Sequence, residues 1–317
     1  MSSNAATNAA QKLVGQMVAG YTVGPLIATG GMGAIYNATG PMATTEPLAI
    51  KILRPEFAEQ TEFLKRFERE AYLLMMIDHP HIVPVYDFGH SETITFLVMR
   101  LIRGPTLHSF EAEHHFSPQN ARQVIEPLAS ALDYAHARQI IHRDLKPGNV
   151  LLEARADGSY HVYLSDFGLS KTNSSSVLTI AGKSLGTPQY MSPEQVLDYP
   201  LDRRSDVYAL GILTYQLLLG RLPFNARTPQ QVAWMHVKDM PPPPRSLAPN
   251  FPRAIEEVLL KALAKSPKDR HDTASDFSHA YAQAVEKSAV SARTTVYWIG
   301  PAELPPVKPA PPRPSSI

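Results

Sequence analysis

Four polar side chains with the chemistry of a metal and phosphate site lie close together along the chain. Asp144, Lys146 and Asn149 fall in the turn-rich segment HRDLKPGN, and Asp166 lies between an apolar stretch and a glycine in SDFG. Carboxylate and carboxamide oxygens in loops suit Mg²⁺, which takes few protein ligands and completes its shell with water and phosphate oxygens. A single loop Asp is most often a turn or cap residue. The prediction of a Mg²⁺ and phosphate site therefore depends on the whole set.

A glutamate and a lysine in apolar surroundings form a second pair of interest. Residues 57–77 predict a helix with one apolar face, which is made of Phe63, Phe67, Ala71 and Leu74. Glu70 lies on that face, and a carboxylate that points into a protein needs a cationic partner or becomes protonated. Lys51, inside the apolar strand LAIKIL, is the natural partner. Taken alone, the pattern is explained better by a purely structural ion pair, or by a Glu70 at the edge of the face, than by a pair with a role in function.

The segment LIATGGMGAIY holds three glycines between two strand-like flanks. Gly30, Gly31 and Gly33 allow a backbone to approach phosphates closely, but an ordinary hairpin turn has a similar composition. Glycine loops of the phosphate-binding kind often begin with another glycine, and Ala28 occupies that position. An alanine forced into a glycine-only conformation costs about 1 kcal/mol. We expect Ala28 to tune a phosphate-covering loop without abolishing it.

The elements that must position these residues change in type along the chain. β-branched and aromatic residues between Gly and Pro breaks predict strands within 21–53 and at 95–102. Helical periods dominate after about residue 117, and two short strands around a turn at 156–158 interrupt them. This order predicts a strand-rich lobe and a helical lobe joined by a hinge near 100–104.

Both ends of the chain have compositions that do not form a core. Residues 1–20 are small and polar and predict a flexible tail. Residues 287–317 contain seven prolines between positions 301 and 314, which predicts an extended linker.

Composition narrows the class of protein. The 317 residues are 44% hydrophobic and 19% charged, as in globular proteins, and a net charge of +1 gives no argument for binding nucleic acid. The absence of cysteine excludes disulfides and thiolate metal sites. No signal peptide is visible, and the apolar stretch VYALGILTYQLLLG is shorter than the ~20 residues of a membrane span. It predicts a buried helix. We expect a cytoplasmic protein, with membrane tethering only if the chain is part of a longer one.

The motifs taken in order resemble a protein kinase catalytic domain, most closely the eukaryotic-like Ser/Thr kinases of bacteria. The matching segments are the glycine loop, LAIK, the helix glutamate, HRDLKPGN, DFG, GTPQYMSPEQ, SDVYALG and SPKDR. The resemblance makes Arg270 the expected partner of Glu194. It implies an α+β, bilobal protein-kinase fold over residues 21–286.

Within that fold the resemblance implies two lobes of different build. The N-lobe, residues 21–99, would be a small antiparallel sheet with one regulatory helix. The C-lobe, residues 105–286, would be larger and helical, with the hinge at 100–104 between them.

The resemblance also implies a role for each catalytic residue. Asp144 would accept the proton of the substrate hydroxyl or orient that hydroxyl, and Lys146 would neutralise charge on the transferred group. Thr187 in GTPQY would bridge these two residues, which favours Ser or Thr as the acceptor. Asn149 and Asp166 would bind Mg²⁺.

The nucleotide site implied by the resemblance is built mainly from the N-lobe. Lys51, fixed by Glu70, would hold the α- and β-phosphates of ATP. The glycine segment would cover the phosphates, Met99 would be the gatekeeper, and Arg100 to Ile102 would form the hinge contact. The complete predicted set of ATP-binding residues is Ile27, Ala28, Gly30, Gly31, Gly33, Ile35, Ala49, Lys51, Met99, Leu101, Ile102 and Leu151.

The predicted activity is ATP- and Mg²⁺-dependent phosphorylation of protein Ser and Thr hydroxyls. The chain itself is one predicted substrate, with Thr179 as the best candidate for an activating phosphate that Arg143 would bind. The main alternative is a pseudokinase scaffold that binds nucleotide without transferring phosphate. A pseudokinase usually lacks at least one of the catalytic and metal-binding residues, and this sequence lacks none of them.

Overall fold

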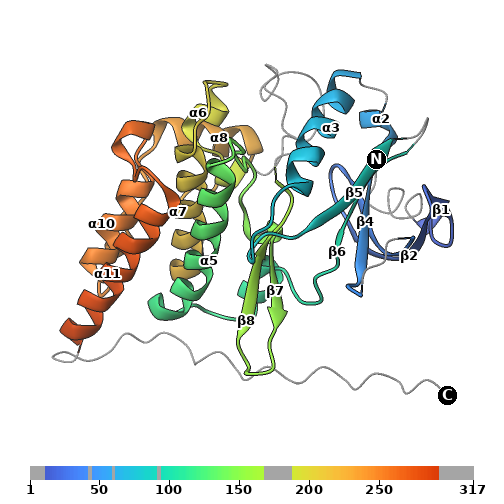
Figure 1. Cartoon of the computed structure of the whole chain (residues 1–317). Coiled ribbons are helices and arrows are strands. Elements are labelled where there is room, and N and C mark those ends of the chain that lie inside the picture. Colours follow the sequence, from blue (N-terminus) through green and yellow to red (C-terminus); the bar gives the residue numbers. More distant parts are fainter. Residues whose placement is uncertain (1–10, 42–44, 59–60, 91–93, 168–187, 293–317) are drawn as a thin grey trace.

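The computed structural model describes residues 11–41, 45–58, 61–90, 94–167 and 188–292. Figure 1 shows two parts side by side, a twisted sheet with α3 (Thr61–Met75) and a larger group of helices. The hairpin of β7 (Val150–Ala154) and β8 (Tyr160–Leu164) lies at their boundary. The predicted α+β fold with a small sheet lobe and a helical lobe is confirmed.

The sheet of the N-lobe is antiparallel throughout, in the order β1-β2-β3-β4-β6-β5. Its strands are β1 (Met17–Val18), β2 (Tyr21–Thr29), β3 (Gly33–Thr39), β4 (Leu48–Leu53), β5 (Val85–His90) and β6 (Thr95–Arg100). β4 is central and apolar on both faces, so five of its six residues are buried and only Lys51 is partly exposed. One face packs around Tyr36, Ile50 and Val98.

Helix α3 covers part of the other face of the sheet. Its buried residues are Phe63, Phe67, Ala71 and Leu74, the four that the helical period predicts. The short helix α2 (Pro55–Ala58) precedes it. The packing of this face against Leu53 and Leu97 fixes the rotation of α3 and directs Glu70 toward the space between the lobes.

The C-lobe is built around α7 (Arg204–Leu219), which is buried on nearly every side. This helix contains the apolar stretch VYALGILTYQLLLG, so the predicted buried helix is confirmed. Its C-terminal cap is Gly220, whose φ of 64° is a left-handed conformation that glycine adopts without strain. The other helices are α4 (Leu107–Glu111), α5 (Pro118–His136), α6 (Pro193–Val196), α8 (Pro229–Lys238), α9 (Pro244–Leu247), α10 (Arg253–Ala262) and α11 (Ala274–Ala292).

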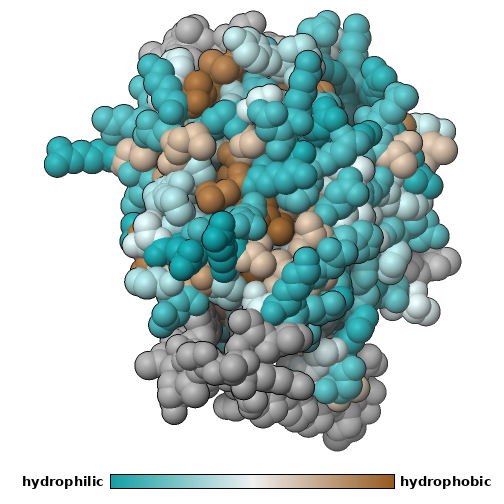
Figure 2. Space-filling view, turned by 90° about the vertical axis from the view of Figure 1, so that its left-hand side faces the viewer, coloured by the Kyte–Doolittle hydropathy of each residue, from teal (hydrophilic) through white to brown (hydrophobic). Residues whose placement is uncertain are grey.

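Three short 3₁₀ turns of the described chain complete this lobe: η1 (Pro147–Asn149), η2 (Pro188–Tyr190) and η3 (Pro267–Asp269). The side of the C-lobe that carries α10 and α11 is covered mainly by hydrophilic side chains, with small apolar areas between them (Figure 2). That face therefore has the character of an ordinary water-exposed surface.

The structure differs from the sequence analysis at both ends of the domain. β1 lies inside residues 1–20, where a loose tail is expected, because Met17 and Val18 pair with the start of β2 and Val18 is buried. At the other end α11 runs to Ala292, past the expected boundary at residue 286. Its inner face packs on α5, and Val285 is the last buried residue among those whose burial is described.

Candidate active site

The HRDLKPGN segment brings three predicted residues into contact. Lys146 Nζ donates to Asp144 Oδ2 at 2.6 Å, and Asn149 Nδ2 donates to the same oxygen at 3.1 Å and to Asp144 O at 2.8 Å. Asn149 is buried in η1, where the turn holds it beneath the loop. Because the side-chain N–H groups of Asn149 donate hydrogen bonds to Asp144, the remaining side-chain oxygen, Oδ1, is the atom suited to bind a metal ion.

A carboxylate from α7 holds this loop from below. Asp206 is fully buried and accepts hydrogen bonds from the backbone N–H groups of His142 (2.8 Å) and Arg143 (2.9 Å) and from His136 Nε2 (2.7 Å). Burial would raise the pKa of Asp206, but its contacts with His136 hold that pKa below the ordinary value. Burial would likewise lower the pKa of His136, and Asp133 and Asp206 raise it to about 9. Asp206 therefore fixes the backbone of the HRDLKPGN segment.

Two residues of the site have left-handed backbones although neither is glycine. The φ angles are 62° at Arg143 and 57° at Asp166. Such conformations cost about 1 kcal/mol or more and persist where the surroundings over-determine them, often at active sites. At Arg143 those surroundings include Asp206. At Asp166 they include Phe167, which is buried against the ring of His142.

The predicted ion pair between Lys51 and Glu70 is not formed. Lys51 Nζ contacts Asp166 Oδ1 at 2.6 Å, and Glu70 Oε1 lies 3.8 Å from Arg143 NH1. The inward-facing carboxylate does have a cationic partner, but one from the C-lobe. Burial raises the pKa of Glu70 and the charge of Arg143 opposes that rise. Residue spacing defines the face of α3 but not its distance from β4, so the pairing of Lys51 with Glu70 in the active form stays a prediction.

The glycine segment forms the turn between β2 and β3, opposite the end of β4. Gly33 is required by packing, since a Cβ there would lie 2.0 Å from Ile52 O. A Cβ on Gly31 would meet nothing within 4 Å, so packing does not explain that glycine. Ala28 pairs with Ile35 in the β2–β3 ladder, and its φ angle is not positive. The expected strain at Ala28 is therefore not present.

Six of the apolar residues predicted to bind ATP converge on one cluster. Ala49, Met99 and Ile102 are buried in it, and Ile35, Leu101 and Leu151 pack against them. Ile27 is 46% exposed at the edge of the sheet. The N–H of Leu101 donates to Pro47 O at 2.8 Å and so faces the sheet. These residues come from both lobes, as a site between the lobes requires.

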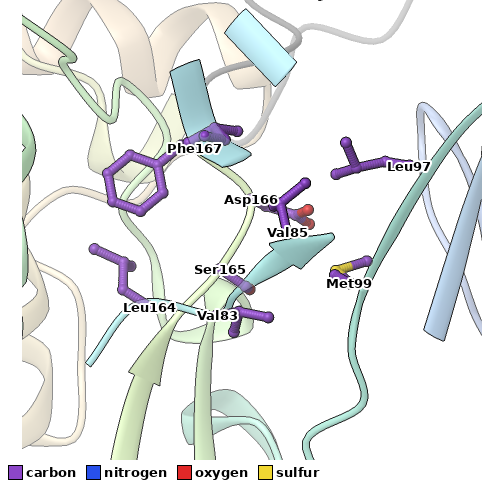
Figure 3. A pocket seen from close by; sticks show the side chains of 9 residues that line it. Val83, Val85, Leu97, Met99, Leu164, Ser165, Asp166 and Phe167 are labelled. Carbon is purple, nitrogen blue, oxygen red and sulfur yellow. The ribbon is translucent and has the colours of Figure 1, made fainter. Parts of the chain in front are cut away.

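A small pocket continues from this cluster toward the catalytic segments (Figure 3). Phe167 and Met99 lie at opposite sides of it in this view, with Val83 and Asp166 between them. Figure 3 shows the carboxylate of Asp166 turned toward β6, while the ring of Phe167 points away from that strand. Asp166 thus faces the space between the lobes where Lys51 meets it.

The oxygen atoms of Asp166 and Asn149 suit Mg²⁺, which binds few protein ligands, better than a metal ion that is coordinated by protein side chains alone. Asp166 and Asn149 supply a carboxylate and an amide oxygen near Asp144 and Lys51. The described residues contain no group of three or more His, Cys, Asp or Glu side chains arranged to hold a metal ion. Mg²⁺ needs no such group, because waters and phosphates complete its octahedron.

Two other predictions from the sequence have different outcomes. The ion pair of Glu194 and Arg270 is confirmed, with distances of 2.7 and 2.8 Å. Thr179 and Thr187 lie outside the described residues, so their predicted roles stay predictions.

No helix among the described residues is long and apolar enough to cross a membrane.

Comparison with known proteins places this geometry in a family. The family described as "Protein kinase domain" matches residues 21–282. The chain is 37% identical over 266 residues to the serine/threonine-protein kinase PrkC of Bacillus subtilis, covering 83% of this chain and 40% of that protein. It is 36% identical over 263 residues to PknB of Mycobacterium tuberculosis, covering 81% of this chain and 41% of that protein.

The match to Pkn3 of Myxococcus xanthus is of the same kind, 37% identical over 84% of this chain and 50% of that protein. The chain thus spans half or less of the length of these relatives. Among solved structures, a mutant PknI kinase domain of Mycobacterium tuberculosis aligns with a TM-score of 0.71 and 27% identity, covering 85% of this chain and 97% of that structure.

Proposed function

The chain belongs to the protein kinase domain family, and we propose that it transfers the γ-phosphate of ATP to Ser and Thr hydroxyls of proteins. The observation that carries this proposal is the contact set of Asp144, Lys146 and Asn149 beside Asp166 and Lys51. Each of these residues has the side-chain type that phosphoryl transfer requires. Relatives named serine/threonine-protein kinases support Ser and Thr as the acceptors.

The chemistry of the acceptor hydroxyl falls to Asp144 and its neighbours. Asp144 Oδ2 would accept the hydroxyl proton, while its hydrogen bonds from Lys146 and Asn149 keep the carboxylate in one orientation. Lys146 carries a positive charge at the place where negative charge develops. Thr187, which lies outside the described residues, is proposed to bridge these two side chains.

The nucleotide side of the site falls to residues of both lobes. When bound, ATP supplies the phosphoryl group and Mg²⁺ neutralises part of its charge. Asp166 and Asn149 would hold the metal ion, and Lys51 would hold phosphate oxygens. A side chain at position 31 would meet no neighbouring atom, yet the residue is glycine. Gly31 therefore leaves the β2–β3 turn open to close approach by phosphates.

The substrates and regulation of the chain form a finer part of the proposal. We propose that protein Ser and Thr residues are the acceptors. The chain is also one of its own substrates, and Thr179 is the best candidate for the phosphorylated residue. Support comes from Arg143, a cation next to Asp144 that now lies near Glu70 and can form charge-assisted hydrogen bonds with a phosphate. No finding favours a pseudokinase.

The test is incubation of the purified chain with labelled ATP and Mg²⁺, followed by mass spectrometry of the phosphorylated residues. Asp144→Asn and Asp166→Asn should each reduce transfer on the order of 100-fold or more, because they remove the proton acceptor and a metal ligand. Asp157→Asn, in the exposed turn between β7 and β8, is the matched control. Near-normal transfer by Asp144→Asn or Asp166→Asn, at unchanged circular dichroism, would disprove the assignment. Phosphate at sites other than Thr179 would disprove only that choice of site.

A further inference from the structure

One carboxylate near the catalytic segment has no role in the proposed reaction. Glu111 is the last residue of α4, and its side chain is only 12% exposed. Its Oε1 accepts a hydrogen bond from Gln216 Nε2 at 2.6 Å and lies 3.3 Å from Nδ1 of the exposed His108. Its Oε2 is buried and has no hydrogen-bond partner among the described residues.

The local structure disfavours a negative charge at this position. Burial raises the pKa of Glu111, and the contact with His108 only partly opposes that rise. The residue also lies at the C-terminal end of a helix, where the backbone carbonyls favour cations. A glutamine could accept the same hydrogen bond from Gln216 without these costs. A carboxylate with one unpartnered oxygen is what a site for a cationic group requires.

The neighbours of Glu111 place it beside the path of a substrate. The hydroxyl of Tyr190 donates to Gln216 Oε1, so the amide nitrogen of Gln216 is turned toward Glu111. Tyr190 belongs to η2, directly after the proposed Thr187, and burial and the charge of Glu111 raise its pKa. Helix α4 packs against η1, which carries Asn149. Glu111 thus lies on a helix that contacts η1, which carries the proposed metal ligand Asn149, and is linked through Gln216 to Tyr190 of η2.

We propose that Glu111 is a specificity-determining residue that binds a Lys or Arg side chain of the protein substrate, close in sequence to the phosphorylated Ser or Thr. The inference depends on the proposed kinase activity. The substrate cation takes over the place of His108, whose side chain is 73% exposed, at Oε1 of Glu111 and donates charge-assisted hydrogen bonds to both carboxylate oxygens. Gln216 and Tyr190 hold the carboxylate in position for this contact.

The test measures kcat/KM on Thr peptides in which each position around the acceptor carries Arg, Gln or Glu in turn. At one peptide position near the acceptor, kcat/KM of the wild-type chain should be higher with Arg than with Gln by on the order of tenfold or more. Glu111→Gln should remove this preference, and Glu111→Lys should shift it toward Glu. Glu113→Gln, an exposed charge change two residues away, should keep it.

The ratio between peptides separates recognition from structural support. If Glu111 only supported the fold, Glu111→Gln would lower the rates on all peptides alike and leave their ratio unchanged. That result, or equal rates on Arg and Gln peptides in the wild-type chain, would overturn the inference while leaving the kinase activity established. If no peptide or protein accepted phosphate, the proposed function would fail, and the inference with it.

Discussion

Charges inside the C-lobe and charges between the lobes are held in different ways. Glu194 and Arg270 are almost fully buried and meet through two hydrogen bonds, and the hydroxyl of Ser205 also donates to Glu194. Between the lobes, Lys51 and Asp166 share one contact and their side chains are 13% and 26% exposed. A second ion pair between the lobes, Glu70 with Arg143, is as long as 3.8 Å, and Arg100 of β6 forms another with Glu153 of β7.

The difference shows which charges can change partner. Arg270 also donates to the backbone carbonyls of residues 204, 264 and 265, so moving it would leave many buried groups without hydrogen bonds. A partly exposed pair with one contact leaves fewer buried groups without partners when it separates, so exchanging it costs less. Lys51 can therefore leave Asp166 for phosphate oxygens or for Glu70. We infer that the C-lobe pair supports the fold and the interlobe pairs serve the reaction.

Breaking the buried pair should have the largest effect on stability. Arg270→Ala should lower the free energy of unfolding by about 3–5 kcal/mol, because it leaves the buried carboxylate of Glu194 uncompensated. The measurement is urea denaturation followed by circular dichroism. Arg253→Ala, which removes an exposed arginine paired with Glu257, is the control and should cost at most about 0.5 kcal/mol. Equal losses in the two variants would erase the distinction between buried and exposed charges.

Removing the charge of Glu70 tests whether the interlobe partners exchange. If Lys51 pairs with Glu70 during turnover, Glu70→Gln should reduce kcat on the order of tenfold to 100-fold, since a charged hydrogen bond is lost. The free energy of unfolding should change little, because the pair seen here is long and partly exposed. Glu68→Gln, on the exposed side of α3, is the control. An unchanged kcat would mean that Glu70 serves only Arg143.

The buried His136 gives the C-lobe a pH dependence that follows from its charge. Its pKa of about 9 exceeds the ordinary value of 6.5, so its contribution to stability is complete below pH 6.5 and is lost as the pH rises through 9. We expect a loss of about 1–3 kcal/mol between these limits, and His136→Gln should remove that part of the pH dependence. Urea denaturation at several pH values measures it, with the exposed His115→Gln as control. A wild-type stability that rose over this range would contradict the prediction.

The sequence predicts those features of the fold and the site that depend on local pattern. The apolar face of α3, the strands within residues 21–53 and the buried helix α7 follow from the local residue pattern. Asp144, Lys146 and Asn149 come together because one short turn contains all three. In each case the neighbours that decide the structure lie within a few residues.

Contacts across long sequence separations could not be predicted from residue spacing. Asp206 supports the catalytic segment from more than 60 residues away, and Glu111 meets Gln216 across 105 residues. The partner of Lys51 depends on the distance between α3 and β4, which residue spacing does not define. The pair of Glu194 and Arg270 was predicted only because the resemblance to a known family supplied it.

The smallest effect is expected where the active site differs from its family in backbone and not in charge. Ala28 lies in the β2–β3 ladder opposite Ile35 without a positive φ, so glycine would relieve no strain there. Glycine in a strand costs about 0.5–1 kcal/mol through lost chain entropy. Ala28→Gly should therefore change the KM for ATP, or kcat, by less than about tenfold. Steady-state kinetics at varied ATP measure this, and Thr29→Gly, at the next position of the same strand, controls for flexibility of the strand. A change of several hundredfold in Ala28→Gly alone would show that this alanine regulates the loop, and that backbone geometry limits the interlobe site as strongly as its charges do.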